Sequence, residues 1–415
     1  MNIVVFEDAG ADQLFPITTG RAAYTITCAS FTLLDLLSEL NGHWVGVVRS
    51  YLEPIQKLDY PIFQPELNSD HEWTLVVNAR LVPSVSNLNG LNKLIDSPSK
   101  QARVIRSGWA VGAAWIPTRH IAGKPDLTVA IEVYCNGAIE KVEMVDQELK
   151  LFEYPHDVIR ANMECFQQNI ALRIEREEYQ QTAENVFVQS QVEIGKHVVM
   201  DTSAGPILID SKSKIGPFSL IRGPVYIGPN SRINEHAAIK DCVSLGHTTK
   251  IGGEIESSVI EGYSNKQHHG FLGHSYLGSW INLGAGTCNS DLKNTYGQVN
   301  MEYGDKKVAT GMQFVGCVIG DYAKSAINTG IFTGKTIGAC SMLYGFVTTN
   351  VPSFVNYARS FGQTTEMPPA VMVSTQKRMF GRRNVDQRPC DVQLIHDMYK
   401  ATATERQLSE SPLSL

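Results

Sequence analysis

The chain has 415 residues, which is too long for a single ordinary hydrophobic core, so we expect two domains with connecting segments. A hydrophobic content of 43% with 19% charged residues is typical of a folded globular protein and excludes a disordered or fibrous chain. The net charge of −6 argues against nucleic acid as a partner, because the chain offers no broad basic field.

The first residues, MNIVVFEDAG, form a short apolar run that Glu7 and Asp8 interrupt. This run has no basic leader and is too short to span a bilayer, so we expect a first β-strand and no membrane segment. The eight cysteines are scattered without a CxxC pair, which is typical of reduced thiols. Together these features predict a cytoplasmic protein.

Residues 1–154 alternate strand-like and helix-like segments, which predicts an α/β sheet domain. The strand-like runs are NIVVF, HWVGVV, WTLVVNARLV and LTVAIEVY, and the helix-like stretches are FTLLDLLSEL and LNGLNKLI. Residues 155–182 are predicted to form a linker helix, because apolar side chains recur there every three or four positions from Ile159 to Ile174. The charged residues from Arg173 to Glu178 are expected to be exposed.

A branched aliphatic side chain returns at every sixth position in the second half of the chain. The eight positions are Ile209, Ile215, Ile221, Ile227, Ile233, Ile239, Leu245 and Ile251. A helix would give a period near 3.6 and an isolated strand a period of 2, so neither explains the pattern. Three such hexads make one coil of 18 residues, which predicts a parallel β-helix of hexapeptide repeats with coils stacked at β-strand spacing.

The phase of the repeat then changes, with Phe271, Leu277 and Leu283 as the expected inward positions. An irregular stretch near 288–310 predicts a functional loop that projects from the solenoid. The repeat resumes at Ile319, Ser325, Ile331, Ile337 and Leu343. We therefore expect a β-helix domain over residues 183–353 and a C-terminal tail over 354–415 with a polar, Ser-rich end.

Three motifs carry a family resemblance: GFLGHSYLGSWINLGAGTCNSDLKN (270–294), KIGPFSLIRGP (214–224) and INEHAAIKD (233–241). They resemble the acetyltransferase core of the bifunctional N-acetylglucosamine-1-phosphate uridyltransferase/glucosamine-1-phosphate acetyltransferase family, and the match covers roughly residues 180–360. The resemblance implies a left-handed β-helix that transfers an acetyl group from acetyl-CoA to glucosamine 1-phosphate or a similar sugar phosphate. It also implies a homotrimer with the CoA cleft between neighbouring solenoids, and a role in UDP-N-acetylglucosamine biosynthesis. The chain looks closest to a variant branch in which the nucleotidyltransferase half has diverged.

Arg222 and Lys240 are 18 residues apart, and each directly follows an inward isoleucine. This spacing predicts that the two cations lie one above the other on neighbouring coils, close enough to share one anion. By resemblance they match the phosphate-binding Arg and Lys of the family. The alternative interpretation is solvated surface charge.

By resemblance, His268 falls on the histidine that acts as general base and takes a proton from the attacking amine. Imidazole suits this role because its ordinary pKa lies near neutrality. However, Lys240 and His268 are 28 residues apart where the family has 12, so about one additional coil lies between them. His247 and His274 therefore remain alternative bases, and a surface role for His268 stays open.

Other acyl-transfer positions follow from the resemblance alone. Phe271 takes the place of a tyrosine that contacts the substrate phosphate, but lacks its hydroxyl. Asn282 matches an acceptor-orienting amide, although an asparagine that stabilises a solenoid corner is an equal interpretation. Asn289 and Asp291 fall where the family contacts the sugar.

The CoA positions are implied in the same way. Ala285, Ala326 and Ala339 fall near backbone positions for the pantetheine arm, where small residues permit close approach. Arg382 lies in STQKRMFGRR, which resembles a family tail whose basic residues meet the CoA phosphates. A solvated terminus is the alternative.

The N-terminal half departs from the nucleotide-binding loop of the family. Gly10 and Gly20 are present but the family lysine is absent, and Arg21, supported by Thr19, is the cation placed to replace it. Asn78 and Arg80 stand in the region where the family has its metal-binding Asp, and neither can replace a carboxylate on Mg²⁺. Asp8 is the remaining candidate Mg²⁺ ligand, with Asp157 as an alternative.

Two interpretations of the N-terminal half therefore stand: a rearranged site that still uses UTP, or a binding or structural module. For the whole chain, the leading hypothesis is a sugar-phosphate acetyltransferase. An acyltransferase acting on a nucleotide-linked amino sugar and a non-catalytic β-helix scaffold are the alternatives.

Overall fold

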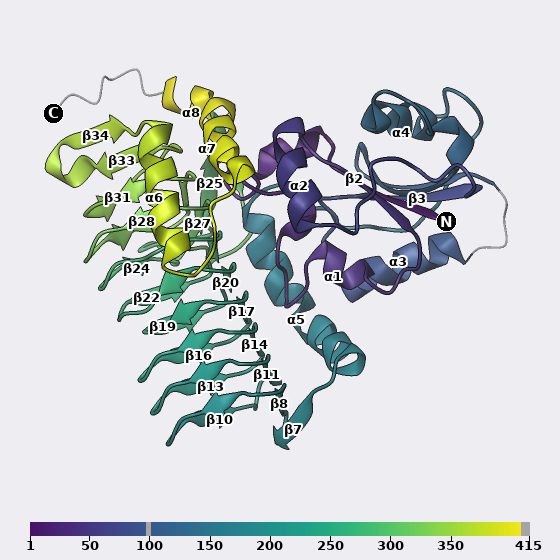
Figure 1. The fold of residues 1–415 in the computed structure, drawn as a ribbon. Helices are drawn as coiled ribbons and strands as arrows, with labels where there is room; N and C mark the ends of the chain where they lie inside the picture. Colours follow the sequence, from purple (N-terminus) through teal and green to yellow (C-terminus); the bar gives the residue numbers. More distant parts are fainter. Residues whose placement is uncertain (97–100, 408–415) are drawn as a thin grey trace. The chain divides into compact units, whose positions relative to one another are not determined.

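A computed structural model describes residues 1–96 and 101–407, and the Ser-rich end expected at 409–415 lies outside the described residues. The chain forms two compact units (Figure 1). The first consists of Met1–Leu14, Arg21–Ile26 and Phe31–Tyr154, and the second of Phe15–Gly20, Thr27–Ser30 and the chain from Pro155 onward. Within the described residues no helix combines the length and apolar character needed to cross a bilayer.

The first unit is built on a mixed six-stranded sheet in the order β2-β1-β3-β5-β4-β6. The strands are β1 (Asn2–Phe6), β2 (His43–Val47), β3 (Trp73–Asn78), β4 (Arg103–Ser107), β5 (Ala110–Pro117) and β6 (Glu143–Met144). Strands β1, β2 and β3 are parallel to one another, whereas β5 runs antiparallel to β3. Because parallel strands end at the same sheet edge, the residues that follow β1, β2 and β3 come together.

The helices of the first unit are α1 (Leu33–Leu37), α2 (Glu53–Asp59), α3 (Val85–Ile95) and α4 (Leu127–Cys135). The α/β prediction is confirmed, but the strand expected for LTVAIEVY is wrong because this run forms α4. Asp126 caps the helix by accepting a hydrogen bond from the amide of Val129 at 3.0 Å, and Ile131 and Tyr134 are buried against the sheet. Capping and burial outweigh the strand preference of the β-branched residues.

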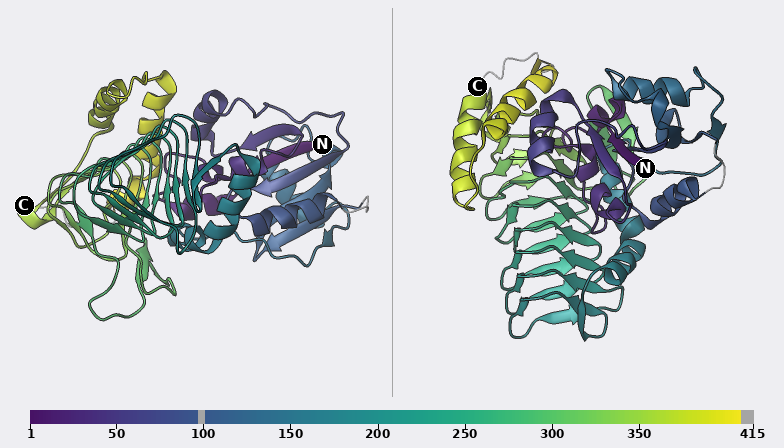
Figure 2. Two further views of the ribbon diagram at one scale, coloured as in Figure 1. Left: turned by 90° about the horizontal axis from the view of Figure 1, so that it is seen from below. Right: turned by 45° about the vertical axis from the view of Figure 1, so that its right-hand side comes forward.

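The second unit contains a parallel β-solenoid with three faces, seen nearly end-on in Figure 2 (left). The first face contains β10 (Val199–Asp201), β13 (Leu220–Arg222), β16 (Ala238–Lys240), β19 (Glu254–Glu256) and β22 (Phe271–Gly273), followed by β24 (Cys288–Asn289), β29 (Gly330–Ile331) and β32 (Phe346–Val347). The second face contains β8 (Val186–Val188), β11 (Ile207–Ile209), β14 (Val225–Ile227), β17 (Val243–Leu245), β20 (Val259–Ile260), β23 (Tyr276–Leu277), β27 (Cys317–Ile319) and β30 (Lys335–Ile337), with β7 (Gln180–Ala183) antiparallel at its edge.

The third face contains β9 (Glu193–Ile194), β12 (Lys214–Ile215), β15 (Arg232–Ile233), β18 (Lys250–Ile251) and β21 (Asn265–Lys266), and later β28 (Lys324–Ser325), β31 (Met342–Leu343) and β33 (Val355–Ala358). Strand β34 (Gln363–Glu366) pairs antiparallel with β33 and ends this sheet. Single-residue bridges through Asn282 connect β21 to β28, so the third face is continuous.

The solenoid interior confirms the six-residue repeat, since all eight aliphatics from Ile209 to Ile251 are buried in one core. The predicted inward position at Phe271 is wrong, because Leu272 is buried instead and Phe271 is half-buried outside the core. The phase slips because Lys240 pairs with Glu256, and Ile251 pairs with Lys266, only 16 and 15 residues later. The coil between them is shorter than the regular 18 residues.

Helix α5 (His156–Arg176) forms where the linker helix is expected, but it ends six residues before 182 because Glu177 adopts an extended conformation. The expected exposure of Arg173 is wrong. Its guanidinium is buried, lies 4.6 Å from the centre of the Tyr226 ring, and donates to the carbonyl of Ser30 at 2.8 Å.

The predicted loop projects from the solenoid after β24 and carries the hairpin β25 (Asn300–Tyr303) and β26 (Lys306–Ala309) (Figure 2, left). The tail is largely helical, with α6 (Pro369–Gly381), α7 (Pro389–Ala401) and α8 (Ala403–Gln407). Helix α6 packs against the solenoid through Phe380, whose ring centre lies 4.4 Å from that of Trp280.

Candidate active site

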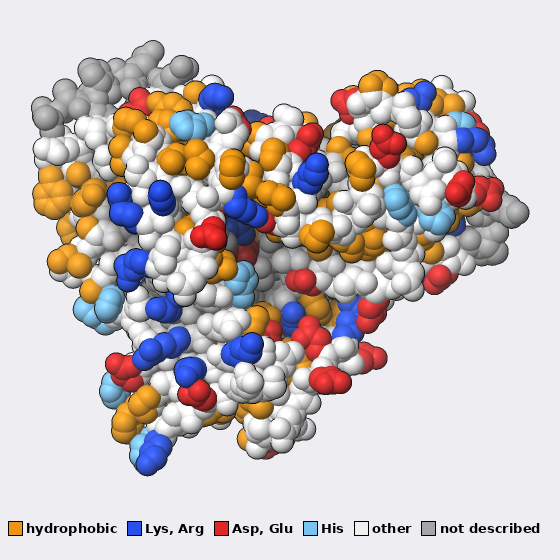
Figure 3. All heavy atoms as spheres, in the orientation of Figure 1, with side chains coloured by type: hydrophobic (Ala, Val, Ile, Leu, Met, Phe, Trp, Pro, Cys, Tyr) orange, Lys and Arg blue, Asp and Glu red, His pale blue; other side chains and the backbone are white. Residues whose placement is uncertain are grey.

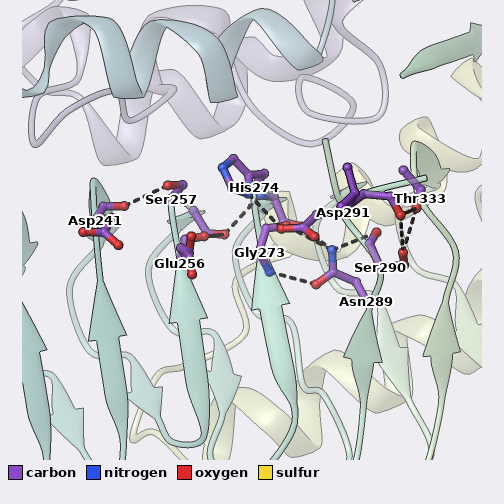
Figure 4. A network of polar contacts seen from close by, with 12 residues as sticks. Asp241, Glu256, Ser257, Gly273, His274, Asn289, Ser290, Asp291 and Thr333 are labelled. Atoms are coloured by element: carbon purple, nitrogen blue, oxygen red, sulfur yellow. Dashed lines mark hydrogen bonds and ion pairs between the residues drawn. The ribbon is translucent and has the colours of Figure 1, made fainter. Parts of the chain in front are cut away.

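One edge of the first face collects the chemically active side chains. Arg222, Lys240, Glu256 and Gly273 are the last residues of four neighbouring strands and are paired in register. His274 follows Gly273 directly, so it lies at the corner where the chain leaves this face. Figure 4 shows Asp241, Glu256 and His274 along this edge. At a strand spacing of about 4.8 Å, the backbones of Lys240 and Gly273 are about 10 Å apart.

His274 forms a hydrogen-bonded pair with Asp291. The distance from His274 Nδ1 to Asp291 Oδ2 is 2.8 Å, and the two side chains are 12% and 14% exposed. The carboxylate accepts from Nδ1–H, so in the neutral form of the imidazole Nε2 is the unprotonated nitrogen. The ring also stacks on Phe314, with centroids 5.2 Å apart. The imidazole is therefore oriented, and its second nitrogen is not used by Asp291.

Asn289 fixes the position of Asp291 through the backbone. Its Oδ1 accepts from the amide of Gly273 at 2.8 Å, and its Nδ2 donates to the carbonyl of Gly273 at 3.0 Å and to Ser275 Oγ at 3.2 Å. The side chain is only 6% exposed. These bonds occupy the amide expected to contact the sugar, so Asn289 serves to join two coils two residues before Asp291.

The backbone of His274 has φ +45°, in the left-handed region. Asp241 and Ser257 occupy the same corner on the two preceding coils with φ values of +53° and +45°. The conformation therefore belongs to the corner of the solenoid. It directs the His274 side chain without marking a strain specific to this residue.

Arg222 and Lys240 are paired in register on neighbouring strands, as the spacing of 18 residues predicts. Both cations form ion pairs with carboxylates. Arg222 donates from Nε to Asp241 Oδ1 at 3.0 Å and from Nη2 to Asp241 Oδ2, and these bonds raise the pKa of Arg222. Lys240 Nζ lies 2.6 Å from Glu254 Oε1 and 3.2 Å from Glu256 Oε2. Burial lowers the pKa of Lys240, but the two glutamates outweigh burial and raise it.
 The other candidate histidines lie at different corners. His268 is exposed at the opposite edge of the first face, three residues before Phe271, and its carbonyl accepts from Lys266 Nζ at 2.7 Å. His247 is exposed between the second and third faces, where Nδ1 lies 3.1 Å from Thr248 Oγ1. The carboxylate partner described above, Asp291, belongs to His274. Phe271 contributes its amide to a bond with Cys288 Sγ at 3.4 Å.

A second group of cations, which we call the third-face cations, consists of Arg232, Lys250, Arg382 and Arg383. Burial lowers the pKa of Lys250, and the charges of Arg383, Arg232 and Arg382 lower it further. Arg383 Nη2 donates to Asn265 Oδ1 at 2.5 Å. In the described residues no carboxylate lies within salt-bridge distance of these four side chains. Figure 3 shows Lys and Arg side chains gathered on this side of the solenoid.

The positions expected near CoA divide into two groups. Asn282 is exposed, and its Oδ1 accepts from Asn265 Nδ2 at 3.3 Å, so it lies beside the third-face cations. Ala285 and Ala326 are partly exposed on neighbouring coils. Ala339 is fully buried, and its amide donates to Ser353 Oγ at 3.1 Å, so it is not open to a pantetheine arm. Arg382 is exposed at the end of α6.

The nucleotide-site positions lie in two parts of the chain. Asp8, Asn78 and Arg80 bond to one another in the first unit, with Asp8 Oδ2 2.7 Å from Arg80 Nη2 and 2.8 Å from Asn78 Nδ2. The carbonyl of Arg21 accepts from Arg49 Nη2 at 3.0 Å in the same unit. Thr19 belongs to a segment that groups with the second unit, and it is fully buried.

The Mg²⁺ expected at Asp8 does not fit this arrangement, because both carboxylate oxygens already accept hydrogen bonds. The alternative ligand, Asp157, lies 2.9 Å from Arg160 Nη1 in the second unit. Across residues 1–96 and 101–407, no group of three or more His, Cys, Asp or Glu side chains is arranged to hold a metal ion.

Several important residues were missed at the sequence level. Asp241, Glu254 and Glu256 neutralise the expected anion-binding pair, and Lys266 occupies an inward position that an aliphatic residue should fill. Asp241 is adjacent to Lys240, and the two glutamates lie in the additional coil, so the signal was present. Their effect on the cations becomes clear only from the register.

A model for the family described as sugar nucleotidyl transferase matches residues 3–178. The chain is 32% identical over 97 residues to a bifunctional sugar-1-phosphate nucleotidylyltransferase/acetyltransferase of Sulfurisphaera tokodaii, covering 23% of this chain and 24% of that protein. It is 32% identical over 161 residues to a bifunctional protein GlmU of Methanococcus aeolicus, covering 38% of each chain. Thus the aligned segments span less than half of these relatives.

A relative of Escherichia coli, the uncharacterized acetyltransferase YaiX, is 33% identical over 157 residues, which make up 37% of this chain and 68% of that protein. Among solved structures, a UDP-N-acetylglucosamine acyltransferase of Francisella novicida is 16% identical with a TM-score of 0.28, over 54% of this chain and 78% of that one. At 33% identity over 68% of the length of YaiX, the chain belongs to the same family as this acetyltransferase, and its residues 3–178 are similar to sugar nucleotidyl transferases.

Proposed function

We propose that the solenoid transfers an acetyl group from acetyl-CoA to the amino group of a sugar phosphate, with glucosamine 1-phosphate as the first acceptor to test. The observation that carries the proposal is the His274–Asp291 pair at the edge of the first face where Arg222 and Lys240 end. The acetyltransferase names of the relatives support the same reaction class.

In this proposal His274 acts as the general base. As the amine nitrogen attacks the thioester carbonyl, His274 Nε2 takes its proton. The C–S bond then breaks, and the imidazolium returns that proton to the leaving sulfur, which releases CoA as the thiol. Asp291 holds the imidazole in the tautomer that leaves Nε2 unprotonated, and it stabilises the imidazolium that forms. A positioned base of this kind contributes roughly 10²–10⁴-fold to the rate.

The third-face cations are proposed to bind the phosphates of CoA, because their mutual repulsion is relieved by an anion. These cations and the His274–Asp291 pair border different edges of one solenoid. We therefore propose that the acetyl-CoA cleft forms between copies in a homotrimer, since a neighbouring copy can bring the two edges together.

Acetyl-CoA as cosubstrate and the free cysteines both favour a cytoplasmic location.

A specific observation favours a second acceptor. A sugar phosphate bound at Arg222 and Lys240 must compete with Asp241, Glu254 and Glu256. An amino sugar linked to a nucleotide, whose phosphates lie away from this edge, avoids that competition. Both acceptors therefore belong in the assay.

The test is release of free thiol from acetyl-CoA by the full-length protein, with glucosamine 1-phosphate or a UDP-linked amino sugar as acceptor. His274→Asn should lower kcat by roughly 10²–10⁴-fold with an unchanged unfolding midpoint, because it removes the base but keeps a polar side chain. His268→Asn is the matched control and should keep most of the activity. Loss of activity in the His268 variant alone would assign the base to His268, and no acceptor-dependent thiol release would favour a scaffold.

A further inference from the structure

The edge of the first unit where a nucleotide would be expected is filled by the chain's own ion pairs. In open α/β sheets, ligands bind beyond the carboxyl ends of the parallel strands. Here Glu7 and Asp8 follow β1, Arg49 follows β2, and Asn78 and Arg80 mark the end of β3. All five side chains are bonded within this group.

Asp8 has no acceptor position left for a metal ion. Its Oδ1 accepts from Arg80 Nε at 2.7 Å and from the amide of Gly10 at 3.1 Å, and its Oδ2 accepts from Arg80 Nη2 at 2.7 Å and from Asn78 Nδ2 at 2.8 Å. Burial raises the pKa of Asp8, but Arg80, Asn78 and Gly10 outweigh burial and lower it. Four donors on two oxygens use the full capacity of a carboxylate.

The glycine of the loop accommodates a side chain of the protein. A Cβ at Gly10 would lie 2.4 Å from Arg80 Cζ, so the absence of a side chain at residue 10 allows the guanidinium to lie against the loop. In phosphate-binding loops a glycine gives the same close approach to a phosphate. Arg80 is held there by a further bond from Nη1 to the carbonyl of Phe152 at 2.7 Å.

A second ion pair closes the neighbouring strand end. The Glu7 side chain is 2% exposed, and its Oε2 accepts from the amide and Nε of Arg49, both at 3.0 Å. Its Oε1 accepts from Arg49 Nη2 at 3.1 Å and from the amide of Ala23 at 2.8 Å. The backbone that follows Arg21 is therefore tied to Glu7.

We infer that these ion pairs form an internal ionic lock in place of a nucleotide–metal site, and that the first unit transfers no nucleotidyl group. The lock comprises Asp8–Arg80 and Glu7–Arg49. Metal binding at Asp8 requires Arg80 to move away. The guanidinium would then be buried without its carboxylate partner, which costs free energy. The two ion pairs join the carboxyl ends of β1, β2 and β3 to one another.

The direct test measures Mn²⁺ binding to the full-length protein by electron paramagnetic resonance, with and without UTP. Pyrophosphate release from UTP, dTTP, ATP, CTP and GTP is measured in parallel with glucosamine 1-phosphate and Mg²⁺. We expect the same Mn²⁺ binding in the wild type and in Asp8→Asn, and no pyrophosphate above the background. Stoichiometric Mn²⁺ binding that Asp8→Asn abolishes, or metal-dependent pyrophosphate release, would overturn the inference.

A stability measurement tests the lock itself. Arg80→Met should lower the unfolding midpoint of the first unit by roughly 10 °C, because it leaves the Asp8 carboxylate buried without its guanidinium partner. Adding Asp8→Asn to Arg80→Met should restore part of the midpoint, since the uncompensated charge is removed. The exposed Asp70 provides the matched control Asp70→Asn, which should have no effect. Strictly additive losses in the double variant would contradict the coupling.

Discussion

Two columns of cations on the same solenoid have different surroundings. On the first face, Arg222 and Lys240 each have carboxylate partners, namely Asp241, Glu254 and Glu256. On the third face, Lys250 is surrounded by other cations and has its pKa lowered by burial and by their charges. The strand geometry is the same in both columns, so the neighbouring carboxylates decide which one is ready to bind an anion.

Lys266 sharpens this comparison, because among the described residues its amine is bonded to backbone carbonyls and forms no ion pair with a carboxylate. It lies in the solenoid interior with 2% exposure, its Nζ donates to the carbonyls of Gly252 and His268 at 3.2 and 2.7 Å, and burial lowers its pKa to about 8. Between pH 8 and 10.5 the unfolded chain holds this proton and the folded chain does not, so stability should rise with pH.

The measurement is the unfolding free energy of wild type and Lys266→Met from pH 7 to 10.5. The wild type should gain about 3 kcal/mol relative to the variant over this range, at about 1.4 kcal/mol per pH unit. Lys324, whose pKa is also lowered to about 8 by burial, is present in both proteins and cancels. A difference that stays constant with pH would show that the Lys266 amine keeps an ordinary pKa.

The third-face cations provide the next largest effect. Lys250→Ala and Arg383→Ala should each raise the KM for acetyl-CoA on the order of tenfold with little change in kcat, since each loses a charged contact to phosphate. Lys214→Ala is the matched control, because Lys214 lies in the same column but is paired with Glu193 at 2.8 Å. Equal KM values in all three variants would mean that CoA binds elsewhere.

The smallest effect is expected from releasing the cations of the first face. Replacing both glutamates, Glu254→Gln with Glu256→Gln, should lower the KM for glucosamine 1-phosphate by roughly three- to fivefold, because Lys240 becomes available to the phosphate. The UDP-linked acceptor should be much less affected. A higher KM for the sugar phosphate would indicate that the glutamates contact the acceptor directly.

The sequence predicted the solenoid because one inward aliphatic side chain in every six residues can be recognised without knowing which strands pair. The prediction failed at Phe271, where shortened coils moved the inward position to Leu272. It failed also at α4, where Asp126 caps a helix rich in β-branched residues. The length of a coil depends on its pairing with the next coil, and a helix cap depends on a residue outside the apolar pattern. The periodicity of the sequence shows neither.

The candidate site was predictable in part. The spacing of Arg222 and Lys240 gave their stacking, and Asp291 was identified as a site residue. The pairing of His274 with Asp291 is not readable from the chain, because 17 residues separate them and Asn289 sets the approach through Gly273. Likewise, the Arg80–Asp8 pair joins the ends of two strands 72 residues apart.

The short segments Phe15–Gly20 and Thr27–Ser30 make the two halves of the chain inseparable as linear fragments. Thr27 donates from its amide and hydroxyl to the buried carboxylate of Glu261, at 2.9 and 2.8 Å, and the amide of Ala29 donates to Asn162 Oδ1 at 2.9 Å. A cut near residue 154 would leave the solenoid with a buried acid deprived of these donors. The fragment from Pro155 onward would lack two segments of its own compact unit, and the N-terminal fragment would carry those segments without the residues they pack with.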